Sequence, residues 1–336
     1  MKKTISLLLG LSALSLSSCN KISPIGILVA GTAVEDRVQM SHLFFLNHKL
    51  DYSLLIADGE DYTFIVGADS HLTTDPGRMD EMLSIGLRDN DLFYAHLGDI
   101  ADTKAEYYIT LDSLLDEAKQ RYVAAKYVKL NDFEYEDKRY PGEFRYTYDE
   151  IKYPFLPVVG NHDITHNGWA LWSNIFHSSF YEVDVLVPIG EDDVAFDRLI
   201  FLDSASGTLG KTQIDLIEQG TLDGKYDDGT SLYRNTFVFS HTNIFHPQFF
   251  EFASTFTREE TYFLLQQFEE WNATCVFCGH VHMWDERDYN GVHYLTLETM
   301  CEKNNPDPGD YLVRMHIGGD GSVAWEPVHM SYTQKK

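Results

Sequence analysis

Five short segments of this sequence carry closely spaced Asp, Asn and His residues, and each comes soon after an apolar run typical of a buried β-strand. Because the carboxyl ends of strands in an open α/β sheet converge on one crevice, we expect these side chains to meet in one place. Carboxylate, amide and imidazole groups together suit divalent transition metals and need no thiolate. The segments are Asp69-Ser-His71, Gly98-Asp99-Ile-Ala-Asp102, Gly160-Asn161-His162-Asp163, the lone His241, and Gly279-His280-Val-His282.

Each segment alone has an ordinary structural explanation. An Asp-Ser-His or Gly-His-Val-His sequence can occur by chance or can end a capped strand, and Gly-Asn-His-Asp is compatible with a simple turn. Five such segments in order, each after an expected strand, are better explained by a shared metal site.

The order of the segments resembles that of the calcineurin-like metallophosphoesterase superfamily, whose pattern is DxH, GD, GNH(D/E), a lone His and GHxH. The resemblance covers roughly residues 60 to 330. It implies an α/β fold, a four-layer α/β/β/α sandwich with mixed sheets, and two metal ions at the sheet edge. The implied activity is hydrolysis of phosphoester bonds by hydroxide that the two metal ions bind.

The resemblance also assigns metal ligands, residue by residue. Asp99 would bridge two divalent transition metal ions, and Mn, Fe and Zn all accept this kind of donor set. The remaining ligands would be Asp69, His71 and His282 for the first ion, and Asn161, His241 and His280 for the second.

Two further residues receive catalytic roles. His162 stands beside a ligand and would protonate the leaving oxygen or stabilise charge on the phosphoryl oxygens. Asp163 would orient His162 through a hydrogen bond. Asp102 occupies a position where purple acid phosphatases carry a Tyr, so their charge-transfer iron centre is not expected. We expect Asp102 to cap the helix that starts near residue 104.

The elements that position these residues alternate along the chain, which favours a mixed α/β fold. A capping box at Thr257 opens a helix that ends near Trp271. A Tyr-rich insert at 131–152 either forms a rim over the site or is a solvated excursion. Strands are expected at 62–66, 92–96, 155–159, 195–202, 236–239, 274–277, 292–297, 311–317 and 323–327, and other helices at 35–47, 104–126 and 213–219.

The charge composition limits the classes of molecule that the protein can be expected to bind. The chain has 336 residues, with 52 Asp and Glu against 26 Lys and Arg, and its formal net charge is -26. Such a chain repels phosphate backbones and anionic membrane surfaces, so no nucleic-acid partner is expected. With 44% apolar and 14% aromatic residues it is not a disordered acidic tail. A small phosphoester is therefore favoured over a polyanionic substrate.

The amino terminus has the features of an export signal. Two lysines precede a short apolar run, and Leu16-Ser-Ser-Cys19 is a candidate lipobox. The protein would then be exported and attached to a bacterial membrane only through lipid on its new amino-terminal cysteine, facing the periplasm or the cell exterior. The alternative is an ordinary signal peptide with an incidental cysteine. The expected divisions are a lipoprotein signal peptide at 1–18, a tether at 19–34 and a single metallophosphoesterase domain at 35–336.

Cys275 and Cys278 form a CxxC pattern inside an apolar segment that is expected to be a strand. Three residues of strand separate two Cα atoms by roughly 10 Å, which is beyond disulfide range. A zinc site would need a second pair of ligands. We therefore expect buried core cysteines.

Two functions remain open. The first is a metal-dependent phosphoesterase acting on a small substrate, and whether it cuts a monoester, a diester or a pyrophosphate stays open. The alternative is a non-catalytic metal-binding scaffold lipoprotein of the same fold. Because every ligand position of the pattern is filled, the sequence favours the enzyme. The oligomeric state is not indicated.

Overall fold

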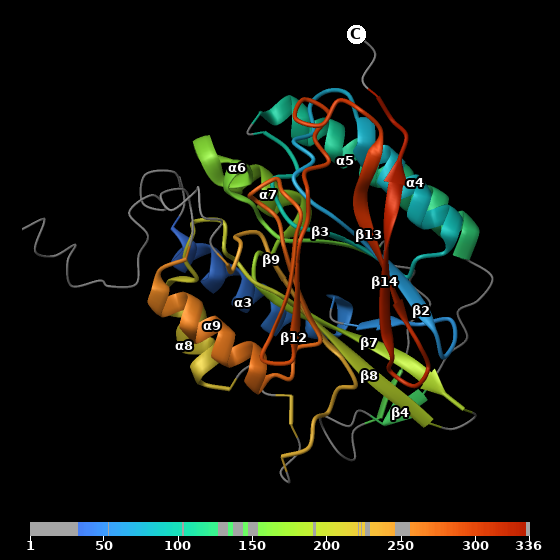
Figure 1. The fold of residues 1–336 in the computed structure, drawn as a ribbon, viewed down its shortest axis with the longest axis vertical. Coiled ribbons are helices and arrows are strands. Elements are labelled where there is room, and N and C mark those ends of the chain that lie inside the picture. The colour runs from blue at the N-terminus through green and yellow to red at the C-terminus, as the bar shows by residue number, and fades with distance from the viewer. Residues whose placement is uncertain are drawn as a thin grey trace, which may run out of the picture.

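The computed structural model describes residues 33–52, 54–102, 104–126, 134–136, 144–146, 154–190, 193–220, 222, 224–225, 229–245 and 256–333. Within these residues the chain forms a seven-stranded sheet, a five-stranded sheet and a separate two-stranded ladder. The two large sheets pack face to face with helices on their outer faces, as Figure 1 shows. The expected mixed α/β fold with four layers is confirmed.

The five-stranded sheet has the order β14-β13-β2-β3-β6. Its central strands β2, β3 and β6 run parallel, whereas β13 is antiparallel to both β2 and β14. The strands are β2 (Tyr62–Gly67), β3 (Phe93–His96), β6 (Phe155–Pro157), β13 (Gly309–Ile317) and β14 (Val323–Met330).

The seven-stranded sheet has the order β1-β7-β8-β9-β10-β12-β11. Strands β8, β9, β10 and β12 are parallel, and β7 and β11 are antiparallel to their neighbours β8 and β12. The strands are β1 (Leu54–Ile56), β7 (Tyr181–Ile189), β8 (Asp193–Phe201), β9 (Thr236–Ser240), β10 (Cys275–Cys278), β11 (Asp285–Tyr289) and β12 (Val292–Thr296).

Each outer face is covered by its own helices. On the five-stranded sheet lie α4 (Gly77–Asp89), α5 (Ala105–Lys126) and α7 (Trp169–Phe176), which bury Met82, Leu111 and Trp172. The other sheet is covered by α3 (Val34–Tyr52), α8 (Gly210–Glu218) and α9 (Arg258–Glu270). Two short elements, α6 (Asn161–Ile164) and the 3₁₀ turn η1 (Thr165–Asn167), follow β6.

A cluster of phenylalanines joins the two sheets. Phe64 of β2 stacks on Phe93 with ring centroids 4.3 Å apart. Across the interface its ring meets Phe237, Phe239 and Phe277 edge to face, at centroid distances of 5.2, 6.4 and 6.2 Å. Because these rings are fully buried and in favourable geometries, they fix the spacing of the sheets whose ends carry the site.

Several expected elements are confirmed with small changes of boundary. The capping box is present: the Thr257 hydroxyl accepts a hydrogen bond from the Glu260 backbone. Helix α8 begins at Gly210 rather than at residue 213. Cys275 and Cys278 are buried and unbonded, as expected for core cysteines.

Other elements were not anticipated, among them β1, β7, β11, α4, α6 and α7. Strand β7 does carry a period of two, with Val183, Val185 and Val187 all pointing into the core between the sheets. Helix α4 contains Gly86, which weakens its helical signal; a Cβ there would lie 2.2 Å from the Tyr94 ring. In α4 tight packing on β3 therefore outweighs helix propensity.

Some predictions fall outside the described residues. These include the signal peptide and the tether up to residue 32. Of the insert at 131–152, only β4 (Glu134–Glu136) and β5 (Phe144–Tyr146) are described, and they pair antiparallel. No helix among the described residues is long and apolar enough to cross a membrane.

Replacement of Phe64 by Ala should destabilise the protein by about 3–5 kcal/mol, because it removes a buried ring and leaves a cavity between the sheets. Urea unfolding measures the loss. Tyr262 of α9, which is 70% exposed, provides the control, since Tyr262→Ala should change the free energy of unfolding by less than about 0.5 kcal/mol. Equal effects of the two substitutions would contradict this account of the core.

Candidate metal centre

The candidate site residues follow strands of both sheets. Strands β2, β3 and β6 end just before Asp69, Asp99 and Asn161, and β9 and β10 end just before His241 and His280. The first three strands belong to the five-stranded sheet and the last two to the seven-stranded sheet. The site therefore lies across one end of the sandwich, where the carboxyl ends of parallel strands from both sheets meet.

Hydrogen bonds lock the loops to one another. The amides of Asp69 and His71 donate to the carbonyls of Gly98 and Asp99, at 3.1 and 2.9 Å. The two sheets are joined where the His241 ring places Nδ1 2.7 Å from the carbonyl oxygen of Leu97. This contact fixes the proton on Nδ1 and leaves Nε2 as the donor atom that faces the site.

Five of the proposed ligands have left-handed backbone conformations, which non-glycine residues adopt at a cost of roughly 1–3 kcal/mol each. The five φ angles are 51° for Asp69, 43° for His71, 51° for Asp99, 71° for His280 and 57° for His282. Strain of this kind clusters where function requires it. The backbone is thus held in an unfavourable form at the positions that the sequence assigned to chemistry.

Glycines permit the close approach of the loops. A Cβ on Gly160 would lie 2.1 Å from the Asp99 amide nitrogen, and one on Gly279 would lie 2.7 Å from Oδ2 of Asp69. Gly98 has a φ of 90°, and a Cβ there would lie 2.7 Å from Nδ1 of His241. The glycines of the three motifs are therefore needed for packing around the carboxylates.

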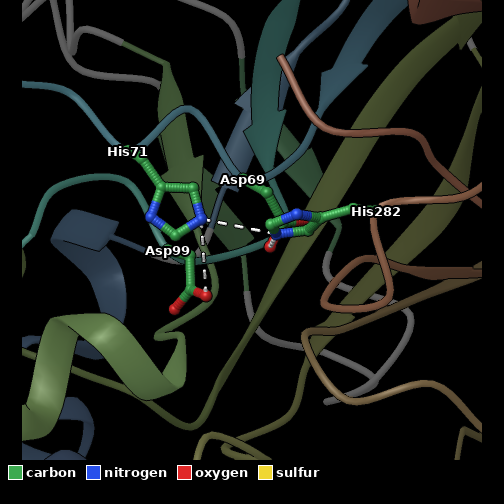
Figure 2. A group of neighbouring side chains, drawn as sticks. All are labelled: Asp69, His71, Asp99 and His282. Atoms are coloured by element: carbon green, nitrogen blue, oxygen red, sulfur yellow. Dashed lines mark hydrogen bonds and ion pairs between the residues drawn. The ribbon is translucent and has the colours of Figure 1, made fainter. Parts of the chain in front are cut away.

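A first group of donors comprises Asp69, His71, Asp99 and His282, drawn in Figure 2. Nε2 of His71 lies 3.4 Å from Nε2 of His282 and 3.9 Å from Oδ2 of Asp99. Nε2 of His282 is also 3.4 Å from Oδ1 of Asp69. Four candidate ligand atoms thus face one small volume.

A second group comprises Asp99, His241 and His280. Oδ2 of Asp99 lies 3.5 Å from Nε2 of His241, and Oδ1 of Asn161 lies 2.9 Å from that same nitrogen. The rings of His241 and His280 are 4.9 Å apart. Asp99 belongs to both groups, which is the place that a bridging carboxylate requires.

The donors fit a pair of divalent transition metal ions. The carboxylate of Asp69 is fully buried, so water does not reach it. Its Oδ1 atom accepts no hydrogen bond among the described residues. A buried carboxylate oxygen without a hydrogen bond is costly unless a cation compensates it. The surrounding imidazole and amide groups are the ones that Mn, Fe and Zn accept. That each of these residues binds metal remains a prediction.

The ionisation states of Asp69 and His280 also favour a bound cation. Burial tends to raise the pKa of Asp69, but contact with His282 and the charges of His241 and His71 outweigh it and lower the pKa to about 2. Burial lowers the pKa of His280 to about 4, with the charge of His241 contributing. Asp69 is therefore an anionic donor and His280 a neutral one at physiological pH.

The structure corrects the role expected of Asp163. Its carboxylate is fully buried and accepts hydrogen bonds from the amides of Gly160, Ile100 and Ala101, at 2.9, 3.2 and 3.3 Å, and from the hydroxyl of Tyr108. It does not bond the His162 ring. Asp163 instead ties the loop after β6 to the loop after β3. Burial and the charge of Asp99 raise the pKa of Asp163 to about 7.

The structure also corrects the role expected of Asp102. Oδ1 of Asp102 lies 3.1 Å from Nδ1 of His162 and 3.2 Å from Nδ1 of His71. The side chain faces the site rather than capping α5. The sequence did contain a signal for this position, namely the short distance along the chain from Asp99 to Asp102. The three residues that follow Asp99 run beside the segment of His71, which brings Asp102 to the site.

A cavity of about 520 Å³ opens beside the first group of donors. Its wall includes His71, Asp102, His162 and His282. The His162 side chain is 49% exposed, so its ring can meet a molecule in the cavity. A volume of this size accommodates a small ligand larger than a phosphate group.

Comparisons with known proteins agree at the level of the fold alone. No known family model and no curated protein matches the sequence. Similar solved structures include GAP50, the anchor in the inner membrane complex of Plasmodium, with a TM-score of 0.48 and 12% identity, covering 82% of this chain and 90% of GAP50. The α/β/β/α sandwich with Asp and His residues at its strand ends is the arrangement that the resemblance to calcineurin-like metallophosphoesterases implies.

Two enzymes are also among the similar structures. A dimetal phosphatase from Danio rerio has a TM-score of 0.43 and 13% identity, covering 81% of this chain and 99% of its own. Phosphopantetheinyl hydrolase from Mycobacterium tuberculosis has a TM-score of 0.39 and 13% identity, covering 76% and 95%.

Metal binding should release a proton from His71 at pH 7.5. Burial lowers the pKa of His71, but the hydrogen bond with Asp102 and the charges of Asp99 and Asp69 outweigh it and raise the pKa to about 9. In the metal-free chain His71 is therefore protonated below about pH 9, and a metal ion must displace that proton. Asp102→Asn removes the hydrogen bond that raises the pKa most, so a smaller fraction of His71 should be protonated at pH 7.5.

Titration calorimetry in two buffers of different ionisation enthalpy measures the protons released. We expect the wild type to release more protons on metal binding than Asp102→Asn at pH 7.5. Asp310→Asn is the matched control, since it removes the exposed carboxylate that pairs with His329. Equal proton release from the wild type and Asp102→Asn would contradict the assignment of His71 as a ligand.

Proposed function

We propose that the chain is a metal-dependent hydrolase of phosphoester bonds. The observation that carries the proposal is the position of Asp99, whose Oδ2 faces His71 on one side and His241 on the other. One carboxylate shared by two donor groups is the arrangement for a pair of metal ions. Such pairs recur in enzymes that displace groups from phosphorus.

The chain's own residues would divide the work. Asp69, His71, Asp99 and His282 would hold one ion, and Asn161, His241 and His280 would hold the second with Asp99. When bound, the two ions would supply positive charge for the phosphoryl oxygens and an activated water at neutral pH. Asn161 would contribute a neutral oxygen, which limits the negative charge of the site.

His162 would act as the general acid that donates a proton to the leaving oxygen. Asp102 lies 3.1 Å from Nδ1 of His162, so Nδ1 carries a proton donated to that carboxylate. This leaves Nε2 as the atom that can carry the second proton and deliver it to the departing oxygen. The carboxylate fixes the orientation of the ring. Asp102 thus takes the supporting role that the sequence suggested for Asp163.

The substrate that we propose is a small phosphoester, either a monoester or a diester. The net charge of -26 repels polyanionic chains at a distance, whereas a cavity of about 520 Å³ admits a small molecule. We also propose that the protein acts outside the cytoplasm, attached through lipid on Cys19, because the first residues have the pattern of a lipoprotein signal.

Substitution of two site residues should separate metal binding from proton transfer. Asp99→Ala should lose both metal ions and all turnover, because no neighbouring group can replace the shared carboxylate. His162→Ala should retain the metals and lose roughly 10²- to 10⁴-fold in kcat, since general acid catalysis is removed. Metal content per chain and turnover of bis-p-nitrophenyl phosphate, p-nitrophenyl phosphate and nucleotides measure both effects.

His329→Ala is the matched control, because His329 is an exposed histidine 2.8 Å from Asp310 in a similar His–Asp pair. It should leave kcat unchanged. Full turnover by Asp99→Ala would overturn the two-metal assignment. Tight binding of two metals without turnover of any phosphoester would support the scaffold alternative instead.

A further inference from the structure

The loop between β12 and β13, residues 297–308, is tied to the candidate metal centre. The hydroxyl of Thr299 donates to the carbonyl of Asp69 at 2.7 Å. The side-chain amide of Asn304 lies 3.1 Å from Nδ1 of His282, and the side-chain amide of Asn305 donates to the carbonyl of Thr299 at 2.9 Å. The loop is therefore held in a fixed position relative to two proposed ligands.

This loop places Lys303 in the wall of the cavity that also contains His71, His162 and His282. The Lys303 side chain is exposed, and its ammonium group forms no ion pair within the part of the chain that the structure describes. Acidic residues outnumber basic ones two to one in this chain, so a cation in the cavity wall stands out against a mostly anionic surface. Its charge is available to a molecule in the cavity.

The other charged groups of the cavity wall are already engaged. The guanidinium of Arg78, the second basic residue there, donates to the carbonyls of Met300, Asp307 and Tyr332. Glu302 accepts a hydrogen bond from the amide of Arg78 at 2.8 Å. Arg78 thus serves to hold the loop, and Lys303 is the wall residue whose cation remains free to bind an anion.

Asp75 and Asp102 are occupied as well. The carboxylate of Asp75 accepts from the amide of Gly77 and from the hydroxyl of Tyr332, at 3.1 and 2.7 Å. Asp102 is shared by two histidines. Neither carboxylate is directed at Lys303, so neither neutralises its charge by contact.

Asn304, the neighbour of Lys303, contacts the Nδ1 side of the His282 ring. The loop contacts His282 through Nδ1, whereas Nε2 of the same ring faces Asp69 and His71. At Asn304, next to Lys303, the loop thus lies on the side of the ring opposite the metal donors. A cation there meets the part of a ligand that extends away from the metals, and the cavity is large enough for that part.

Resting on the proposed function, we propose that Lys303 determines specificity by binding a second anionic group on the alcohol portion of the substrate. The preferred substrate is then a small phosphoester whose alcohol carries a carboxylate or a further phosphate. Attraction at this point offsets the repulsion that the acidic surface exerts on any anion. The rigid loop means that little ordering of the lysine backbone is required on binding.

Two matched pairs of compounds test this inference, one for each class of ester. Phosphoserine and phosphoethanolamine are monoesters that differ only in a carboxylate, and glycerophosphoserine and glycerophosphoethanolamine are the corresponding diesters. With metal-loaded protein, the serine compound of the hydrolysed class should have the higher kcat/KM. Lys303→Gln should lower kcat/KM for that compound roughly tenfold, mainly through KM, and leave the ethanolamine compound within about twofold.

Lys225→Gln is the control, since it removes the same charge from an exposed lysine outside the cavity wall. It should leave the ratio of the two kcat/KM values unchanged. An equal loss for both compounds in Lys303→Gln would mean that Lys303 binds the reacting phosphoryl group, and no loss would mean that it binds nothing; either result overturns the inference.

A different experimental result would show that the proposed function is wrong. If the metal-loaded wild type hydrolysed none of the four compounds or any other phosphoester, the proposed function would be wrong. The inference about Lys303 would still be decided by binding, because calorimetry gives the affinity of the same protein for phosphoserine and phosphoethanolamine. Equal affinities would refute the inference without reference to turnover.

Discussion

The carboxylate of Asp99 lies where the ends of two β-sheets come together, and most of the site is arranged around its two oxygens. Oδ1 accepts a hydrogen bond of 2.7 Å from the amide of His162, which fixes the start of the loop after β6. Oδ2 is left to face His71 and His241. With its side chain only 2% exposed, Asp99 cannot exchange these partners for water. A buried carboxylate of this kind needs compensation by cations.

The fold provides the rigidity that such a site requires. Several acidic groups are buried together, and burial with the charge of Asp99 raises the pKa of Asp163 to about 7. Left-handed backbone at five proposed ligands adds a further cost. Both costs are offset by the aromatic core between the sheets, where Phe64 meets rings from the opposite sheet. The core positions the strands, and the strands position the loops.

Much of this arrangement could be predicted from the sequence. The motifs after β2, β3, β6, β9 and β10 are short and lie directly after buried strands, so topology alone brings them to one edge. The direction in which individual side chains point was less accessible. Asp163 was expected to orient His162, but its carboxylate turns inward to backbone amides, and Asp102 takes that place. Sequence spacing does not encode such rotations, because they depend on how separate loops pack.

Lys303 illustrates a second limit on what the sequence can predict about the site. Nothing in its sequence surroundings marks it, since its position depends on contacts of its loop with Asp69, His282 and Arg78, which lie on separate parts of the fold. Its importance becomes visible only once the neighbouring charges are seen to be engaged elsewhere. The specificity that we propose thus rests on a loop that follows the last metal motif rather than on the motifs themselves.

Electron paramagnetic resonance of the protein loaded with Mn²⁺ tests the central claim most directly. A carboxylate shared by two sites holds two ions close enough for their spins to couple. The account predicts two Mn²⁺ per chain and the multiline spectrum of an exchange-coupled pair. A stoichiometry of one, or the six-line spectrum of isolated Mn²⁺ at full occupancy, would contradict it.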